Sequence, residues 1–248
     1  MMSFINDQDG WVEAFFQGAT GNDLVAIFRT TDGGKTWVPL SQTPIGPALP
    51  NVPTTFPFFG HKSGLTLVNA STGRAAVYIP GDSVLHLYVT HDGGATWQGR
   101  TLSLPSNEVG IAMPPPTLFK AHGGILPVDF QAPAGSGKEF LVTHDDGASW
   151  QDPTPIPTYE GVANFIDMAH VWVAAAQGTD LYSSSDGAQQ WKKMTPTIPI
   201  HITGFAQLNF ISPTTGWAVG LTGSDANPKA ILLKTTTGGQ TWTIASDQ

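Results

Sequence analysis

Short stretches in which apolar and polar residues alternate recur along the whole chain. The clearest set lies near the carboxyl end, where FAQLNFI, WAVGL, AILLKTT and TWTIAS are separated by polar or turn-forming segments. Such alternation predicts half-buried β-strands, and the Gly, Ser, Thr and Pro between them predict turns. No stretch has the period of an amphipathic helix. The pattern therefore predicts four antiparallel strands joined by SPTTG, TGSDANPK and TGGQ.

An eight-residue string follows the third of these strands and recurs along the chain. It reads TTDGGKTW at 30–37, THDGGATW at 90–97 and THDDGASW at 143–150, and in weaker form SSDGAQQW at 184–191 and TTTGGQTW at 235–242. The closing residues lie 41 to 60 positions apart, a spacing typical of propeller blades rather than of helical repeats. They are Trp37, Trp97, Trp150, Trp191 and Trp242.

A second pattern precedes each string, an aromatic or leucine residue six positions before the start of the second strand. We align the pairs as Phe4 with Gly10, Phe58 with Gly64, Leu118 with Gly124, Phe165 with Val171, and Phe210 with Gly216. Two patterns in fixed order predict an all-β fold, a single β-propeller over 1–248 with five four-stranded antiparallel blades. The blades are expected at about 1–41, 55–101, 116–152, 163–194 and 204–246.

The five blades are expected to form a ring closed by side-chain packing between the first and the last blade. The alternatives are a fragment of a longer propeller and an oligomer that completes the ring. Neighbouring blades protect one another's strand edges in each case.

The aspartate of each string is expected to clamp its turn. A turn aspartate accepts hydrogen bonds from backbone N–H groups that follow it, and Gly34 or Gly94 supplies a positive φ. The tryptophan begins the fourth strand and packs between blades. Because the copies lie on separate blades, they do not converge on one catalytic or metal site, and we expect neither a metal nor a cofactor. These turn aspartates are Asp32, Asp92, Asp145 and Asp186.

Composition and charge narrow the possible partners. Of 248 residues only 12% are charged, the net charge is −8, and Arg29, Arg74 and Arg100 are the only arginines. No basic run is present to neutralise phosphates, so nucleic acid is excluded as a partner, and no apolar run is long enough for membrane insertion. A chain without cysteine, rich in Thr, Pro and Gly, is typical of an exported bacterial protein, periplasmic or extracellular. Residues 1–10 nevertheless lack the basic start and apolar core of a secretory signal.

The string [S/T]-x-D-x-G-x-[S/T]-W resembles the Asp-box, or BNR, repeat of sialidases and other β-propellers, over essentially the whole chain. Sialidase chemistry would bring an arginine triad and a RIP motif before the first box, but that segment reads IFRTTDGG. The paired patterns are more similar to the photosystem II stability/assembly factor-like BNR proteins. That resemblance implies a non-catalytic scaffold that binds a protein or a glycan, although arginine-rich patches of that group have no counterpart here.

The alternative is a carbohydrate-active hydrolase, sialidase- or xyloglucanase-like, which would need two carboxylates or a Tyr–Glu pair. For either function we expect the site opposite the aspartate turns, on the fourth-to-first and second-to-third strand connections. The long Pro-rich connections cover 41–55, 101–116, 152–162 and 194–203, and the second set covers 70–83, 131–139 and 222–229. The candidate ligand-binding residues there are Arg74, Tyr78, Asp82, Glu108, Tyr159, Glu160 and His201.

Overall fold

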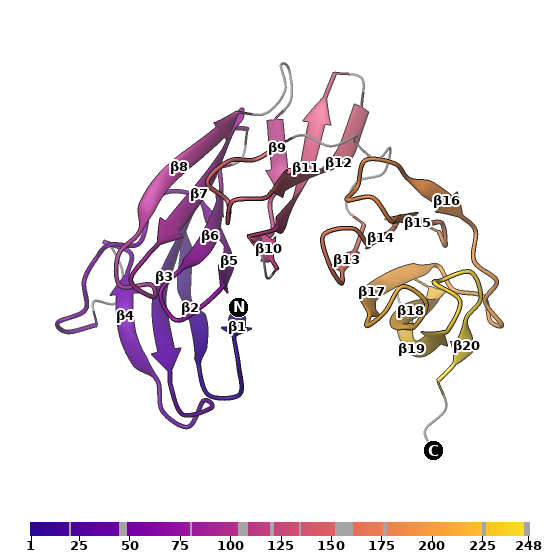
Figure 1. Cartoon of the computed structure of the whole chain (residues 1–248), viewed down its shortest axis with the longest axis horizontal. Coiled ribbons are helices and arrows are strands. Elements are labelled where there is room, and N and C mark those ends of the chain that lie inside the picture. Colours follow the sequence, from indigo (N-terminus) through magenta and orange to yellow (C-terminus); the bar gives the residue numbers. More distant parts are fainter. Residues whose placement is uncertain are drawn as a thin grey trace. The chain divides into compact units, whose positions relative to one another are not determined.

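The structure, a computed structural model, describes residues 1–19, 21–44, 49–79, 81–103, 109–119, 122–133, 135–151, 161–175, 178–224 and 227–245. Within these ranges the regular structure is all β, and no helix is long and apolar enough to span a membrane. The chain divides into two compact units, residues 1–135 with 141–151 and residues 136–140 with 152–248. Figure 1 labels the strands of both units.

Two four-stranded antiparallel sheets begin the first unit. The strands of each are hydrogen-bonded in chain order, as the alternating pattern predicts. The first sheet contains β1 (Met2–Phe4), β2 (Gly10–Ala19), β3 (Asn22–Thr30) and β4 (Val38–Gln42), and the second contains β5 (His61–Leu67), β6 (Gly73–Tyr78), β7 (Val84–Thr90) and β8 (Gln98–Ser103).

The third sheet obtains its fourth strand in a different way. It contains β9 (Val109–Ala112), β10 (Thr117–Leu118), β11 (Gly124–Ala132) and β12 (Gly135–Thr143), and both β9 and β10 pair with β11. The prolines between β9 and β10 lack the N–H that a ladder needs, so the first strand is split in two. The expected strand after Trp150 is reduced to one bridge, Val142 to Gln151.

The fourth and fifth sheets also follow chain order. The fourth contains β13 (Ala163–Phe165), β14 (Val171–Ala174), β15 (Leu181–Ser184) and β16 (Lys192–Met194), and the fifth contains β17 (Gly204–Phe210), β18 (Gly216–Ser224), β19 (Asn227–Thr235) and β20 (Thr243–Ile244). Each of the five sheets thus has four antiparallel strands, as predicted, although in the third sheet the split first strand makes up the number.

The expected loops between second and third strands are mostly wrong. Strand β6 lies inside 70–83, and β11 and β12 extend far into 131–139. In 222–229, β18 and β19 continue until Ser224 pairs with Asn227. A ladder uses backbone groups, so it can run through polar residues and through Gly223, which has φ +88°. The sheets therefore reach further than composition suggests.

The second repeat is aligned differently from our expectation. In four of the five sheets a ring or leucine side chain covers the glycine that begins the second strand: a Cβ at Gly10 would meet Phe4, and one at Gly73 would meet Leu67 at 2.4 Å. The pair in the second repeat is therefore Leu67 with Gly73, not Phe58 with Gly64. As a result, Arg74 occupies the position that Trp11 occupies in the first repeat.

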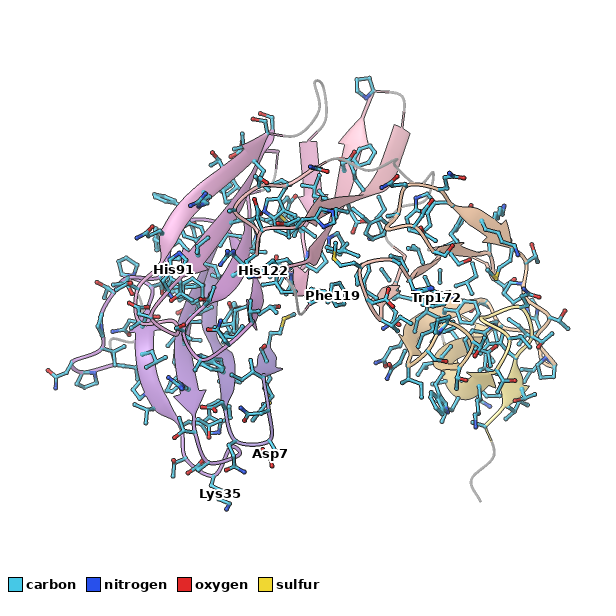
Figure 2. The ribbon with its side chains drawn as sticks, viewed as in Figure 1. Asp7, Lys35, His91, Phe119, His122 and Trp172 are labelled. Atoms are coloured by element: carbon cyan, nitrogen blue, oxygen red, sulfur yellow. The ribbon has the colours of Figure 1, made fainter. Side chains whose placement is uncertain are left out.

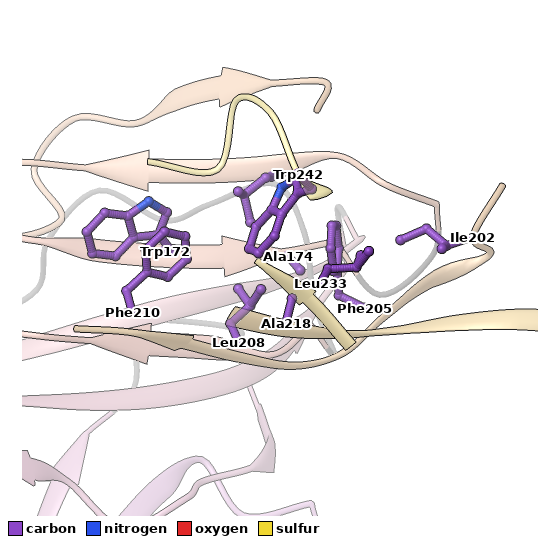
Figure 3. Close-up of a cluster of buried hydrophobic side chains, with 10 residues drawn as sticks. Trp172, Ala174, Ile202, Phe205, Leu208, Phe210, Ala218, Leu233 and Trp242 are labelled. Atoms are coloured by element: carbon purple, nitrogen blue, oxygen red, sulfur yellow. The ribbon is translucent and has the colours of Figure 1, made fainter. Parts of the chain in front are cut away.

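Hydrophobic cores form where neighbouring sheets of one unit face each other. In the first unit Trp11, Val25 and Ile27 of the first sheet pack against Leu65 and Trp97 of the second. A second cluster joins the second sheet to the third. In the second unit the cluster in Figure 3 joins the fourth and fifth sheets, and its members are Trp172, Ala174, Leu181, Ile202, Phe205, Leu208, Phe210, Ala218, Leu233 and Trp242. Burial between sheets is thus the main apolar contribution to stability in both units.

Candidate functional site

The aspartate turns are closed by their own side chains. In the first, Asp32 Oδ1 accepts the Thr36 N–H at 2.9 Å and Asp32 Oδ2 accepts the Thr36 hydroxyl at 2.6 Å. Thr30 Oγ1 donates to Asp32 at 2.8 Å and accepts the Gly34 N–H at 2.9 Å. The hydrogen bonds from Thr36 lower the pKa of Asp32 to about 2. The carboxylate is therefore ionised and fully engaged within its turn.

The same bonds recur in the other repeats. Asp92 and Asp145 accept from Thr96 and Ser149 in the same geometry, and Asp186 accepts the Gln190 N–H at 3.0 Å. In the fifth repeat the Thr237 hydroxyl takes the place of the carboxylate and accepts the Thr241 N–H at 2.9 Å. These groups hold hairpins and leave little capacity for acid–base chemistry.

In three repeats, a side chain of the second strand donates a hydrogen bond to the turn between the third and fourth strands of the next repeat. Trp11 Nε1 donates to the Gly93 carbonyl at 2.7 Å, and Trp172 Nε1 donates to the Gly238 carbonyl at 3.1 Å. Arg74 Nη2 donates to the equivalent carbonyl, that of Asp146. Arg74 is buried among these turns. Its expected place on the opposite, connection side is therefore wrong.

The remaining predicted site residues do not form one described cluster. The Tyr78 ring stacks on His61 with centroids 6.2 Å apart, and Asp82 Oδ2 lies 3.0 Å from His86 Nε2, both near the β6–β7 connection. His201 lies far along the chain in the connection before β17. Glu108, Tyr159 and Glu160 lie outside the described residues.

A cleft of about 530 Å³ opens in the second unit on the side of the aspartate turns. Trp172, labelled in Figure 2, and Trp191 supply its aromatic lining, and Met194 adds a thioether. The polar lining comes from the turns and from β16, and consists of His170, Ser183, Ser184, Ser185, Asp186, Gln190, Lys192, Thr214, Thr237 and Gln240. Sequence reasoning missed this cleft because its walls come from three strands and four turns that are far apart in the sequence.

The carboxylate in this lining, that of Asp186, already accepts hydrogen bonds within its own turn. It accepts from the Ser184 hydroxyl at 2.8 Å and from the Gln190 N–H, and the hydrogen bond from Gln190 leads the lowering of its pKa. The His170 ring is held by Asp167 at 2.9 Å and stacks against Trp172. Exposed Lys192 carries the positive charge in the lining. The cleft combines apolar surface with polar groups suited to binding.

A second pocket of the same unit contains one predicted residue. His201 lines a space of about 310 Å³ together with Pro196, Ile198, Pro199 and Ile200. Its walls are the Pro-rich connection 194–203, where we expected binding. The lining side chains other than those of Thr179 and His201 are apolar.

The first unit buries a charged cluster that the alternating pattern did not reveal. Glu13 on β2 is buried, its Oε2 has no hydrogen-bond partner, and burial raises its pKa to about 7. Lys62 Nζ donates to the carbonyls of Phe58, Phe59 and Gly60 at 2.6 to 2.9 Å, and burial lowers its pKa to about 8. The described residues contain no group of three acidic, His or Cys side chains arranged to hold a metal.

These observations define the class of protein: an all-β fold of five four-stranded antiparallel sheets, which is a β-propeller. The chain is 25% identical to the photosystem II assembly protein Ycf48 of Thermosynechococcus vestitus, over 97% of this chain and 70% of that protein. No protein-family model matches it.

Two solved structures share the fold. YCF48 bound to a D1 peptide is 19% identical, with a TM-score of 0.55 over 98% of this chain and 79% of that one. The GH74 xyloglucanase of Xanthomonas campestris is 14% identical, with a TM-score of 0.63 over 99% of this chain and 38% of that one. At these identities the likeness concerns the fold alone.

Proposed function

We propose that this chain is a non-catalytic binding propeller that holds a peptide segment of a partner protein in the turn-side cleft of the second unit. The observation that carries the proposal is the lining of that cleft. Aromatic surface from Trp172 and Trp191 lies beside hydroxyl, amide and lysine groups, whereas its carboxylate, Asp186, is engaged in its own turn.

Peptides are bound by this combination of surfaces. Aromatic and apolar walls bury side chains, and a few polar groups fix the orientation of the backbone. The similarity to an assembly protein, and the fold shared with a protein solved with a bound peptide, support a binding role rather than an enzyme. An exported location, periplasmic or extracellular, is part of the proposal.

The hydrolase alternative would need two carboxylates placed about 5 to 9.5 Å apart at one mouth. Its candidates, Glu108 and Glu160, lie outside the described residues. The hydrolase alternative is therefore tested by its own activity. Robust turnover of aryl glycosides or xyloglucan, lost in Glu108→Gln or Glu160→Gln, would replace the binding proposal.

The test begins with peptides of about 12 residues displayed on phage and selected on the intact protein, a length that spans a cleft of this kind. Titration calorimetry then measures the selected peptides against Lys192→Glu and Met194→Ser. We expect at least about tenfold weaker binding, about 1.4 kcal/mol.

Lys229→Glu is the matched control. Lys229 is an exposed lysine on β19, at the opposite end of that strand from the turn at 235–242. Its substitution should leave the affinity unchanged. Peptides that bind equally well to the cleft variants and to this control would place recognition elsewhere and refute the cleft as the site. Selection of no peptide, with binding of an oligosaccharide instead, would favour a lectin.

A further inference from the structure

The turn-side cleft of the second unit opens at a place where the first repeat has an arginine. In the first repeat Trp11 is paired across the ladder with Arg29. The guanidinium carbon of Arg29 lies 4.9 Å from the centre of the Trp11 ring, and its Nη1 would lie 3.6 Å from a Cβ at Gly93. Asp9 Oδ1 accepts from Arg29 Nη2 at 3.1 Å. A guanidinium thus fills the space between the indole, the turn glycine and the residue before the second strand.

The fifth repeat places a cation in the same way. Trp217 is paired with Lys234, and the ammonium nitrogen lies 5.4 Å from the centre of the Trp217 ring. A positive group over the face of an aromatic ring is attracted by the negative charge of that face. In both repeats the cation comes from the third strand, opposite the tryptophan of the second strand.

The fourth repeat has the tryptophan but no cation opposite it. Trp172 is paired with Ser183, whose side chain is short and uncharged. His170 stands directly before the second strand, at the position that Asp9 has in the first repeat. All three side chains of the fourth repeat line the cleft.

The turn that borders this space is also equivalent. Gly238 lines the cleft, and its carbonyl accepts the Trp172 indole N–H at 3.1 Å. In the first unit the Gly93 carbonyl accepts the Trp11 indole N–H at 2.7 Å. The cleft is therefore bordered by the same three positions that surround the guanidinium in the first repeat, while a serine replaces the arginine.

The charges near the cleft indicate what else its ligand carries. Asp186 lines the cleft, and the chain has a net charge of −8, so a cationic group is attracted. Exposed Lys192 is paired with Ser183 and lies on β16, the outer neighbour of β15. Because like charges repel across a ladder, an arginine beside Trp172 is best accommodated when the ligand also brings an anion to Lys192.

We propose that the peptide held in the cleft presents an arginine next to an acidic residue. The guanidinium lies against Trp172, in the place that Arg29 fills in the first repeat, and the acidic side chain pairs with Lys192. A planar guanidinium can stack on the indole while its N–H groups donate in the plane. The inference rests on the proposed function, because the partner's peptide supplies both groups, and it adds the side chain that the aromatic wall selects.

The first test needs no peptide, because the chain itself supplies the guanidinium. In a Lys192→Val background, Ser183→Arg copies the row of Trp11, Arg29 and Val38 in the first repeat. Filling the site should raise Tm by about 2 to 4 °C over that background, the size expected for one cation–π contact in a protein of this length. Ser183→Gln, which is similar in length and uncharged, should gain little or nothing.

The second test uses the peptides selected on the intact protein, measured by titration calorimetry. Their sequences should share an arginine with Asp or Glu beside it. Citrulline in place of that arginine keeps the shape and removes the charge, and should weaken binding at least about tenfold. Ser183→Arg should also weaken binding at least about tenfold, because its own side chain occupies the site. Ser103→Arg, the same change at an exposed strand residue of the first unit, should leave the affinity unchanged.

Failure of the arginine contact can be told apart from failure of the proposed function. Peptides that bind the cleft equally well with citrulline leave the proposed function standing and overturn the arginine contact. A Ser183→Arg variant no more stable than Ser183→Gln overturns it as well, since a guanidinium then does not fit beside Trp172.

If no peptide is selected, the proposed function fails, and the comparison of Tm values alone decides whether the cleft takes a guanidinium. Should Ser183→Arg not fold, Ser183→Lys replaces it with the same required outcomes, because it copies Lys234 opposite Trp217 in the fifth repeat.

Discussion

Glu13 offers a direct test of the buried charge in the first unit. Its pKa rises from 4.5 to about 7 because burial penalises the carboxylate, and the attraction of the terminal amino group and Lys62 offsets only part of that penalty. The folded protein thus binds a proton between pH 4.5 and 7 that the unfolded chain does not. Stability is therefore highest below pH 4.5 with respect to this group and falls as pH rises through 7.

The magnitude follows from the shift. A change from 4.5 to about 7 corresponds to about 3 kcal/mol at 1.36 kcal/mol per pH unit. Glu13→Gln keeps the shape and removes the charge. We expect it to raise the free energy of unfolding by about 3 kcal/mol at pH 8, roughly 6 to 12 °C in Tm for a protein of this size, and to change little at pH 4.5.

The assay is urea unfolding at pH 4.5, 6 and 8, followed by tryptophan fluorescence and circular dichroism. Asp7→Asn, the same type of change at an exposed turn residue, is the control and should not reproduce the pH-dependent gain. The reasoning is refuted if Glu13→Gln is less stable than the parent at pH 8, or if its stability difference from the parent is the same at all three pH values.

Three further predictions concern the turns. Asp92→Ala removes the acceptor for the Thr96 N–H and for two hydroxyls, and should lower the free energy of unfolding in urea by about 1 to 3 kcal/mol. Thr237→Asp restores the carboxylate in the fifth repeat and should leave that free energy unchanged or raise it. Trp172→Phe leaves the Gly238 carbonyl without its indole donor and should cost about 1 to 3 kcal/mol by the same assay; an unchanged midpoint would show that water replaces the bond. Gly94→Ala places a side chain at φ +99° and should destabilise by about 1 kcal/mol or more, while an alanine at Gly99, where φ is not positive, should be milder.

The turns were the most predictable part of the fold. Their hydrogen bonds join residues within four positions of one another, so the string TTDGGKTW contains every group needed to close its hairpin. The alternating strands on either side are equally local. Five sheets could therefore be counted from the sequence.

Features that depend on distant residues were predicted less well. Phe56 and Phe58 precede β5 and resemble the first-strand aromatic of other repeats, so the second repeat was aligned to Gly64 instead of Gly73. Only the packing identifies the correct residue pair: Phe56 is buried against Trp97, while Leu67 covers Gly73. That error alone moved Arg74 from the turn side to the connection side.

The candidate site was harder still. The turn-side cleft draws on two repeats, and its polar residues, such as Gln190 and Gln240, look like ordinary turn residues in the sequence. Burial of Glu13 is equally invisible, because it stands at an inward position of a strand where an apolar residue was expected. Neither feature has a local sequence signature.

The donor from the second strand to the following turn also determines how a perturbation spreads. Because Trp11, Arg74 and Trp172 each tie their own sheet to the next hairpin, damage to one turn weakens the repeat before it as well. Ile125 occupies this position in the third repeat and has no side-chain N–H to donate. We therefore expect the sheets that share such a bond within one unit to unfold together, which makes the linked pair, rather than the single repeat, the smallest segment to exchange between related chains.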